Sequence, residues 1–263
     1  MWKSPVVLLT LSVLACTSAG APPATTGSAA PQASQRARAC FDAASADDGA
    51  TQTTVAMCTA AIAEKPDHPA VMADLLLARG IAYRNQGDFP EALADFDQSL
   101  WLRSDSISTA NMRAWTFREM GEYAAAEEAY SQTLKDQSLK EQVAESRSVW
   151  QAFLSRCVVR QDLGHFSLSA DDCEIALQGR RDEDSLYFAA RAYNRLERCA
   201  EAVPLLEEAL MLEPVLSRIY GELGFAYGCI GNSQRALTVL EEGLERFPGD
   251  EGLQAMRRWV IGI

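Results

Sequence analysis

The sequence predicts an all-α fold built from stacked pairs of helices. Five turn positions recur at spacings of 34, 43, 33 and 34 residues, and a small residue stands seven positions before each. The five positions are Gly87, Gly121, Gly164, Glu197 and Gly231. Between them, apolar residues recur at three- and four-residue steps, which is the helical period. A unit of about 34 residues cannot bury its apolar face alone, so the copies must stack into a solenoid.

The first complete unit illustrates how each repeat is expected to fold. The stretch 75–83 predicts one helix and the stretch 89–102 its partner, because both carry apolar residues at helical spacing. Between them, Gly87 can adopt the left-handed conformation that ends a helix. Asp88 is expected to cap the second helix through its side-chain oxygen. The small residue Gly80 lets the two helices approach closely.

The same periodicity divides the rest of the chain. Residues 69–250 are expected to hold five repeats, and residues 35–68 a degenerate N-terminal repeat. The amphipathic stretch 251–263 is expected to form a C-terminal capping helix. The second and third turns are 43 residues apart where the other spacings are 33 or 34. We expect the additional stretch, 138–150, to lengthen the flanking helices and not to form a loose loop.

These residues resemble the tetratricopeptide-repeat family, whose pattern runs aromatic or Leu, Leu, small, Tyr, then Ala, aromatic, Ala, Pro. The last repeat matches most fully, at Tyr220, Leu223, Gly224, Tyr227, Gly231, Ala236, Leu240, Gly243 and Pro248. The resemblance implies an α-solenoid that binds other polypeptides. Some positions depart from the pattern: Arg79, Arg113 and Arg156 replace a Leu, and Glu197 replaces the fourth turn glycine.

The resemblance also implies a binding groove. In this family the first helix of each unit lines a concave face, and the side chains between its packing positions reach a ligand. This phase gives the candidate partner-binding residues Leu77, Ile81, Arg84, Asn111, Trp115, Arg118, Tyr187, Arg191, Asn194, Arg195 and Phe225. Aromatic and arginine side chains suit recognition of peptide backbone and carboxylates. The alternative is that Trp115 and Phe225 simply pack inside the superhelix.

The N-terminal residues 1–15 are expected to be a signal peptide. Lys3 precedes an apolar run that is too short to span a bilayer, as is typical of secretory signals. The run ends in Val-Leu-Ala-Cys, which resembles the lipobox of bacterial lipoproteins. Cys16 is therefore the expected lipidation site, and the alternative is ordinary signal cleavage near Ala19 or Ala21.

Residues 16–34 are expected to form a flexible tether. They lack charge and are rich in Ala, Pro, Ser, Thr and Gly, so they cannot build a core. A lipid on Cys16 would anchor the domain in a bacterial cell envelope, on the periplasmic side of the outer membrane. Without the lipid, the protein would be periplasmic or secreted.

The cysteines fit an exported protein. The chain has seven, and assigning Cys16 to lipid leaves an even number for an oxidising compartment. The repeat phase proposes the disulfide pairs Cys40–Cys58, Cys157–Cys173 and Cys199–Cys229. The alternative is six small buried thiols that fill helix contacts. A zinc site from Cys157, His165 and Cys173 is disfavoured, because no CxxC or HxxxH spacing supports it.

The net charge and the absence of catalytic motifs exclude several classes of function. The net charge of −12 argues against nucleic acid, which requires a basic surface, and against membrane contact beyond the anchor. Neither His68 nor His165 has a recognisable catalytic partner, and no nucleophile, phosphate-binding or metal-binding motif occurs. The sequence therefore predicts a protein with no catalytic residues, metal or cofactor.

The expected function is a non-enzymatic scaffold or adaptor of the bacterial cell envelope, with an envelope protein or peptide bound in the groove. The alternative is a soluble exported carrier or sensor that holds a small ligand or glycan in the same groove.

Overall fold

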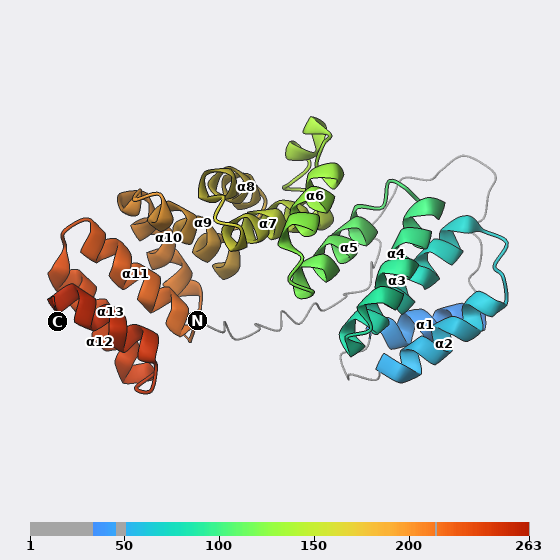
Figure 1. The fold of residues 1–263 in the computed structure, drawn as a ribbon, viewed down its shortest axis with the longest axis horizontal. Helices are drawn as coiled ribbons and strands as arrows, with labels where there is room; N and C mark the ends of the chain where they lie inside the picture. Colours follow the sequence, from blue (N-terminus) through green and yellow to red (C-terminus); the bar gives the residue numbers. More distant parts are fainter. Residues whose placement is uncertain (1–33, 46–50, 214, 263) are drawn as a thin grey trace, which may run out of the picture. The chain divides into compact units, whose positions relative to one another are not determined.

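The structure, a computed structural model, describes residues 34–45, 51–213 and 215–262, and every regular element in them is a helix (Figure 1). The α-helices are α1 (Gln35–Ser45), α2 (Thr51–Ala63), α3 (Pro69–Gln86), α4 (Phe89–Leu102), α5 (Ile107–Glu119), α6 (Tyr123–Thr133), α7 (Arg147–Asp162), α8 (Phe166–Gly179), α9 (Glu183–Arg195), α10 (Cys199–Leu212), α11 (Ser217–Cys229), α12 (Ser233–Arg246) and α13 (Glu251–Ile261). One short 3-10 helix, η1 (Gln137–Lys140), lies between α6 and α7. The all-α prediction is confirmed. The expected signal peptide, Cys16 and nearly all of the expected tether lie outside the described residues.

The described residues fall into two compact units, divided within α5 between Thr116 and Phe117. In the first unit, α1 packs on α2, α2 on α3 and α3 on α4. In the second unit, each α-helix from α6 to α13 packs on the next. Helices paired in chain order are the defining arrangement of an α-solenoid, as the repeat spacing predicts.

Close helix packing depends on the small residues of the repeat. A Cβ on Gly80 would lie 2.6 Å from the ring of Phe96, and Phe96 is fully buried. In the last repeat, a Cβ on Gly224 would lie 2.6 Å from Cγ of Leu240, which is also fully buried. The repeated small residue therefore makes room for a large side chain of the partner helix.

The turn between paired helices has a left-handed residue at its centre. Gly87 has φ 85° and its N–H donates to the Arg84 carbonyl, while the Asp88 N–H donates to the Tyr83 carbonyl. This pair of bonds closes the C-terminal end of α3. Glu197 has the same role in the fourth repeat, at φ 59°, although a side chain disfavours that conformation.

The expected side-chain cap at Asp88 is wrong. Asp88 is the N-cap of α4, but its carboxylate makes no capping hydrogen bond. A cap accepts from the second or third amide of the helix, and Pro90 has no N–H to offer at the second position. Asn232 does cap α12, because its side chain accepts from the N–H of Arg235.

The expected helix extension over residues 138–150 is also wrong. Only its last residues belong to α7, and the rest form η1 and turns. Leu139 and Val143 are buried, so this segment packs as an ordered connection. The side chain of Ser146 accepts from the N–H of Val149 and thereby begins α7, which ends the connection at a defined residue.

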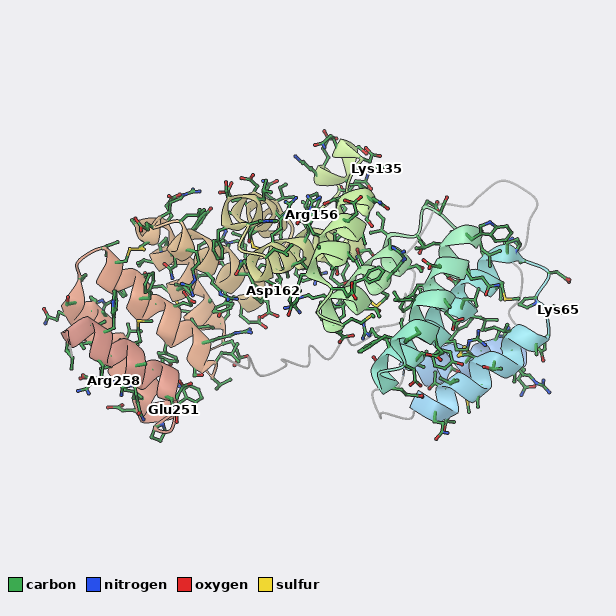
Figure 2. The ribbon with its side chains drawn as sticks, in the orientation of Figure 1. Lys65, Lys135, Arg156, Asp162, Glu251 and Arg258 are labelled. Atoms are coloured by element: carbon green, nitrogen blue, oxygen red, sulfur yellow. A yellow bond between two sulfur atoms is a disulfide. The ribbon has the colours of Figure 1, made fainter. Side chains whose placement is uncertain are left out.

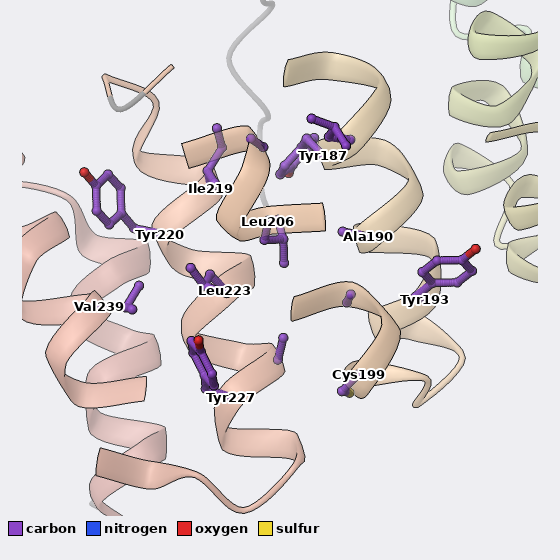
Figure 3. Close-up of a cluster of buried hydrophobic side chains, with 14 of the residues drawn as sticks. Tyr187, Ala190, Tyr193, Cys199, Leu206, Ile219, Tyr220, Leu223, Tyr227 and Val239 are labelled. Carbon is purple, nitrogen blue, oxygen red and sulfur yellow. The ribbon is translucent and has the colours of Figure 1, made fainter. Parts of the chain in front are cut away.

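The core of the second unit runs along the faces between α9, α10, α11 and α12 (Figure 3). Leu206, Ile219 and Leu223 are at most 1% exposed. Small alanines lie between these large side chains, as close helix approach requires. This core fixes α9 and α11 side by side, and those two helices carry many of the candidate binding residues.

Three disulfides join the helices, in the pairs that the repeat phase proposes. Their Cα–Cα distances are 4.7 Å for Cys40–Cys58, 5.5 Å for Cys157–Cys173 and 6.1 Å for Cys199–Cys229. The first two bridges lie within a helix pair, and the third joins α10 to α11 of the next repeat. Among the described helices, none is long and apolar enough to cross a bilayer.

Candidate binding face

The candidate residues lie on the first helix of each pair. We call the side chains that these helices present between their packing positions the first-helix face. In the second unit, α7 contacts α9, and α9 contacts α11, so the first helices of successive repeats are neighbours (Figure 1). In the first unit, the candidates Leu77, Ile81 and Arg84 lie on α3, and Asn111 and Trp115 on α5. In the second unit, Arg118 lies at the end of α5, Tyr187, Arg191, Asn194 and Arg195 lie on α9, and Phe225 lies on α11.

The first-unit candidates are mostly half-buried. Arg84 donates to Oδ1 of Asn85 at 3.0 Å and lies 3.5 Å from Sδ of Met112. Leu77, Ile81 and Trp115 are partly exposed. Asn111 is only 4% exposed, which makes it a residue of the α5 packing surface more than of the open face.

Glu222 of α11 brings three of the α9 candidates together. Its Oε2 accepts from Nδ2 of Asn194 at 2.9 Å, and its Oε1 accepts from Nη2 of Arg195 at 3.2 Å. Nε of Arg191 is 4.0 Å from the same Oε1. Asn194 is 2% exposed and also donates to the Glu222 carbonyl at 3.1 Å, so this carboxylate is held in place.

A second ion pair lies further along the same face. Arg218 of α11 donates to Asp184 of α9, and its guanidinium lies 4.6 Å from the ring centre of Tyr187. The Tyr187 side chain is buried beside α11 (Figure 3). Burial, and then the charge of Glu222, raise the pKa of the Tyr187 phenol, so the hydroxyl keeps its proton at neutral pH.

Phe225 is covered by the C-terminal helix. Its ring stacks on Trp259 of α13 with centres 5.4 Å apart, and the Arg195 guanidinium lies 5.8 Å from its centre. A Cβ on Gly228 would lie 2.6 Å from the Trp259 ring, so α13 packs closely against α11. The Phe225 side chain therefore packs against Trp259 and remains partly exposed.

Arg118 is paired within the second unit. Its Nε donates to Oδ2 of Asp162 on α7 at 2.9 Å, and both side chains are partly exposed. Figure 2 marks Asp162 among the side chains of the second unit. The pair links the end of α5 to α7. A partner that contacts Arg118 would have to compete with Asp162.

Sequence reasoning missed the acids that hold the arginines in the Leu positions. Arg79 makes a bidentate pair with Asp95, at 2.8 and 2.7 Å. Arg156 pairs in the same way with Asp172. Both carboxylates are buried, and each lies 16 residues after its arginine. That shared spacing in two repeats is the signal that could have revealed them.

Asp172 belongs to a larger network. Nη1 of Arg160 donates to Oδ2 of Asp172 at 2.7 Å, and its Nε donates to Oε1 of Glu127 at 2.9 Å. His165 Nδ1 lies 3.2 Å from Oε2 of the same glutamate. Across the described residues, no group of three or more potential ligands could hold a metal ion.

A tyrosine–glutamate hydrogen bond recurs in the second unit. The hydroxyl of Tyr193 donates to Glu174 at 2.7 Å, and that of Tyr227 donates to Glu207. Burial, then the hydrogen bond to Glu174, raise the pKa of Tyr193. An open depression of about 440 Å³ lies here, lined by Glu174, Leu177, Gln178, Arg181, Tyr193, Glu201, Pro204 and Leu205.

A sequence model of one family, described as tetratricopeptide repeat, matches residues 73–103. These residues span the helical hairpin of α3 and α4, and the same turn register recurs through the later repeats. The hairpin of α3 and α4 is a tetratricopeptide repeat, and the described helices have the fold of solved tetratricopeptide-repeat proteins.

Several solved structures share this fold. PilW, a type IV pilus biogenesis factor, has a TM-score of 0.66 at 17% identity, over 84% of this chain and 96% of its own. YrrB, described as having an unusual peptide-binding site, has a TM-score of 0.63 at 15% identity, over 76% and 97%. A tetratricopeptide-repeat protein from Parabacteroides merdae scores 0.62 at 19% identity, over 86% of both chains. No curated protein sequence matches the chain.

Proposed function

We propose that the protein is a non-enzymatic scaffold that binds a partner polypeptide on its first-helix face. The observation that carries the proposal is the arrangement of α7, α9 and α11, which lie side by side and present arginine and aromatic side chains together. Such side chains dominate the binding energy of many protein interfaces. The peptide-binding site named for YrrB adds support from a protein of similar fold.

We also propose that the scaffold works in a bacterial cell envelope, anchored through a lipid on Cys16. Residues 1–15 would be the signal peptide and residues 16–34 the tether. Three disulfides support an oxidising compartment, and PilW, a type IV pilus biogenesis factor, has a similar fold. Intact mass of membrane-extracted protein tests the anchor. The expected mass is that of a chain beginning at an acylated Cys16, and the mass of an unacylated chain cleaved near Ala19 or Ala21 would refute the anchor.

The division of the rest of the chain is part of the proposal. The pair α1–α2 would be a degenerate N-terminal repeat within residues 35–68, and α3 to α12 would be five repeats within residues 69–250. The helix α13, within residues 251–263, would cap the last repeat. The cover that Trp259 gives to Phe225 supports this capping role.

Site-specific photocrosslinking in the native envelope tests the binding face. A photoreactive amino acid at Ile81 or Trp115 samples the first unit, and one at Arg195 samples the second. Matched controls are Trp101 on α4 and Met211 on α10, which are 83% and 79% exposed but lie on second helices. We expect one discrete adduct from the first-helix positions and none from the controls.

Two results would count against the scaffold. Adducts that form only from Trp101 or Met211 would place the partner on the second helices. The absence of any adduct from all three first-helix positions would remove the support for a polypeptide ligand on that face.

A further inference from the structure

The three disulfides differ in how far solvent can reach them. Two bridges lie inside the buried clusters of their units, and all four of their cysteines are 0% exposed: Cys40, Cys58, Cys157 and Cys173. In the third bridge, Cys199 is 1% exposed, but Cys229 is an exposed residue at the C-terminal end of α11. Thiol–disulfide exchange begins when a thiolate reaches one sulfur of a bridge. Among the bridges of the described residues, Cys199–Cys229 is the one that a thiolate can reach, and it can be reached at Cys229.

Cys199 is placed to leave as a thiolate. It is the first residue of α10, a helix of 14 residues, and the N–H groups at a helix N-terminus carry partial positive charge. No side chain of the described residues caps this end of α10. Arg198 precedes Cys199, but its guanidinium donates to both carboxylate oxygens of Glu201, so these two side-chain charges offset each other. The N-terminus of α10 therefore stabilises a thiolate on Cys199, and a stabilised thiolate is the better leaving group.

The surface beside Cys229 is apolar. Ile230 is the next residue and is 46% exposed, and Trp259 of α13 is 52% exposed. Trp259 packs on the same turn of α11, because a Cβ on Gly228 would lie 2.6 Å from its ring. A polypeptide whose cysteine has apolar neighbours would cover these side chains, whereas a small charged thiol would leave them in water. The surroundings of the exposed sulfur therefore favour a polypeptide thiol.

We propose that Cys229 is a thiol–disulfide exchange site, which takes the cysteine of a partner polypeptide with apolar residues on either side of it. The partner thiol loses its proton to solvent, and its thiolate attacks Sγ of Cys229. A sulfur–sulfur bond forms between the partner and Cys229, the bond from Cys229 to Cys199 breaks, and its electron pair leaves on Sγ of Cys199. The partner sulfur is oxidised and the Cys199 sulfur is reduced, so the step needs no further oxidant.

The fold tolerates this exchange. The bridge that opens joins α10 to α11, which belong to successive repeats. These two helices also pack through the buried cluster that includes Leu206 and Leu223, so they stay together when the bridge is open. The proposal goes beyond the scaffold function, because it adds a covalent reaction at the end of α11 and does not depend on a ligand on the first-helix face.

Two reduced pentapeptides test the site with the full oxidised protein. Each has a central cysteine, which is flanked by leucines in one peptide and by serines in the other. The reaction is quenched with maleimide in denaturant and mapped by mass spectrometry. We expect a protein species that carries the peptide on Cys229 and maleimide on Cys199, with no peptide on the four buried cysteines. The leucine peptide should react at least about threefold faster than the serine peptide, after each rate is divided by that peptide's rate with a small-molecule disulfide.

A pair of variants tests the leaving group. Arg198→Asp and Arg198→Asn both remove the guanidinium, and both place a good capping side chain before α10. Only the aspartate adds a negative charge beside the departing Cys199 thiolate. We expect peptide to add to Cys229 about threefold more slowly in Arg198→Asp than in Arg198→Asn, which is the matched control.

A peptide adduct on Cys229 in a protein that keeps its helical far-ultraviolet spectrum supports the proposal. It is overturned if the peptide adds to Cys199 or to the buried cysteines as fast as to Cys229, or if no adduct forms until denaturant unfolds the protein. Equal corrected rates for the two peptides would overturn the assignment to a polypeptide with apolar neighbours. Equal rates in the two Arg198 variants would overturn the role of the α10 N-terminus.

Discussion

Nε and Nη2 of Arg156 donate to the two oxygens of Asp172, at 2.8 and 2.7 Å, in the interior of the second unit. Asp172 also accepts from Arg160, and its side chain is 2% exposed. We expect Asp172→Ala to lower the free energy of unfolding by about 3–5 kcal/mol, because it leaves two arginines without their buried partner. Urea unfolding of the purified oxidised protein measures this.

Asp97→Ala is the matched control for the Asp172 variant. Asp97 pairs with Arg113 at 2.6 Å, but its side chain is 59% exposed. The expected loss is below about 1 kcal/mol, because solvent screens an exposed pair. Equal losses at Asp97 and Asp172 would contradict the role assigned to burial.

Glu197 is expected to be a site where glycine stabilises the fold. Its φ of 59° is left-handed, where the other turn positions of the repeat carry glycine. Glu197→Gly should raise the free energy of unfolding by about 1 kcal/mol, because it removes the clash of Cβ with the backbone. The reciprocal change, Gly164→Ala at φ 78°, should lower it by a similar amount. A destabilised Glu197→Gly protein would show that the Glu197 side chain outweighs the backbone strain.

The three disulfides should differ in their accessibility to reductant. Cys40, Cys58, Cys157 and Cys173 are fully buried, whereas Cys229 is exposed at the end of α11. Under mild reduction of the native protein, we expect Cys199 and Cys229 to be alkylated before the other four cysteines, because exchange requires access to a sulfur. Intact mass and peptide mapping at increasing reductant follow the order. Simultaneous reduction of all three bridges would contradict it.

Asp250 should make the C-terminal helix sensitive to acid. Burial raises the pKa of Asp250, but hydrogen bonds from the N–H groups of Leu253 and Gly252 and the Ser217 hydroxyl outweigh it, so the pKa is lowered overall. A lowered folded-state pKa contributes stability above the unfolded-state pKa, and this is lost as the pH falls through the folded-state value. The unfolding temperature of the parent protein should therefore fall more steeply with decreasing pH than that of Asp250→Asn.

Asp250→Asn is suited to this comparison because asparagine also caps helices well. The two proteins should unfold at similar temperatures near the low end of the pH range and diverge as the pH rises. Parallel curves from pH 7 to pH 3 would show that the Asp250 charge has no part in the acid response.

Local rules predicted the helices well. The sequence predicts a helix over residues 89–102, and α4 spans the same residues. Gly87 marks the turn before this helix, and the apolar period shows how far the helix continues. The insertion near residue 140 was not predictable in the same way. Its structure depends on burial of Leu139 and Val143, which is a tertiary effect that no repeat phase reveals, and on the local cap at Ser146, which begins α7.

The candidate face was predictable in position but not in its pairings. The repeat phase identifies which α9 side chains share a face, since that depends only on helical spacing. It cannot tell that Glu222 engages Asn194 and Arg195 but leaves Arg191 without a hydrogen bond, because those distances depend on the offset between α9 and α11. The stacking of Trp259 on Phe225 likewise depends on how α13 packs against α11, so it emerges only from the fold.

The disulfides also determine how the chain responds to mechanical force. Cys199 and Cys229 are 30 positions apart in the sequence, and the chain between them would extend to roughly 100 Å if it were free. With the bridge closed, pulling on the two ends of the protein cannot release that length, and the two shorter loops are locked in the same way. The oxidised protein can therefore lengthen under tension only through the helices outside its three loops, so oxidation limits how far it stretches before rupture.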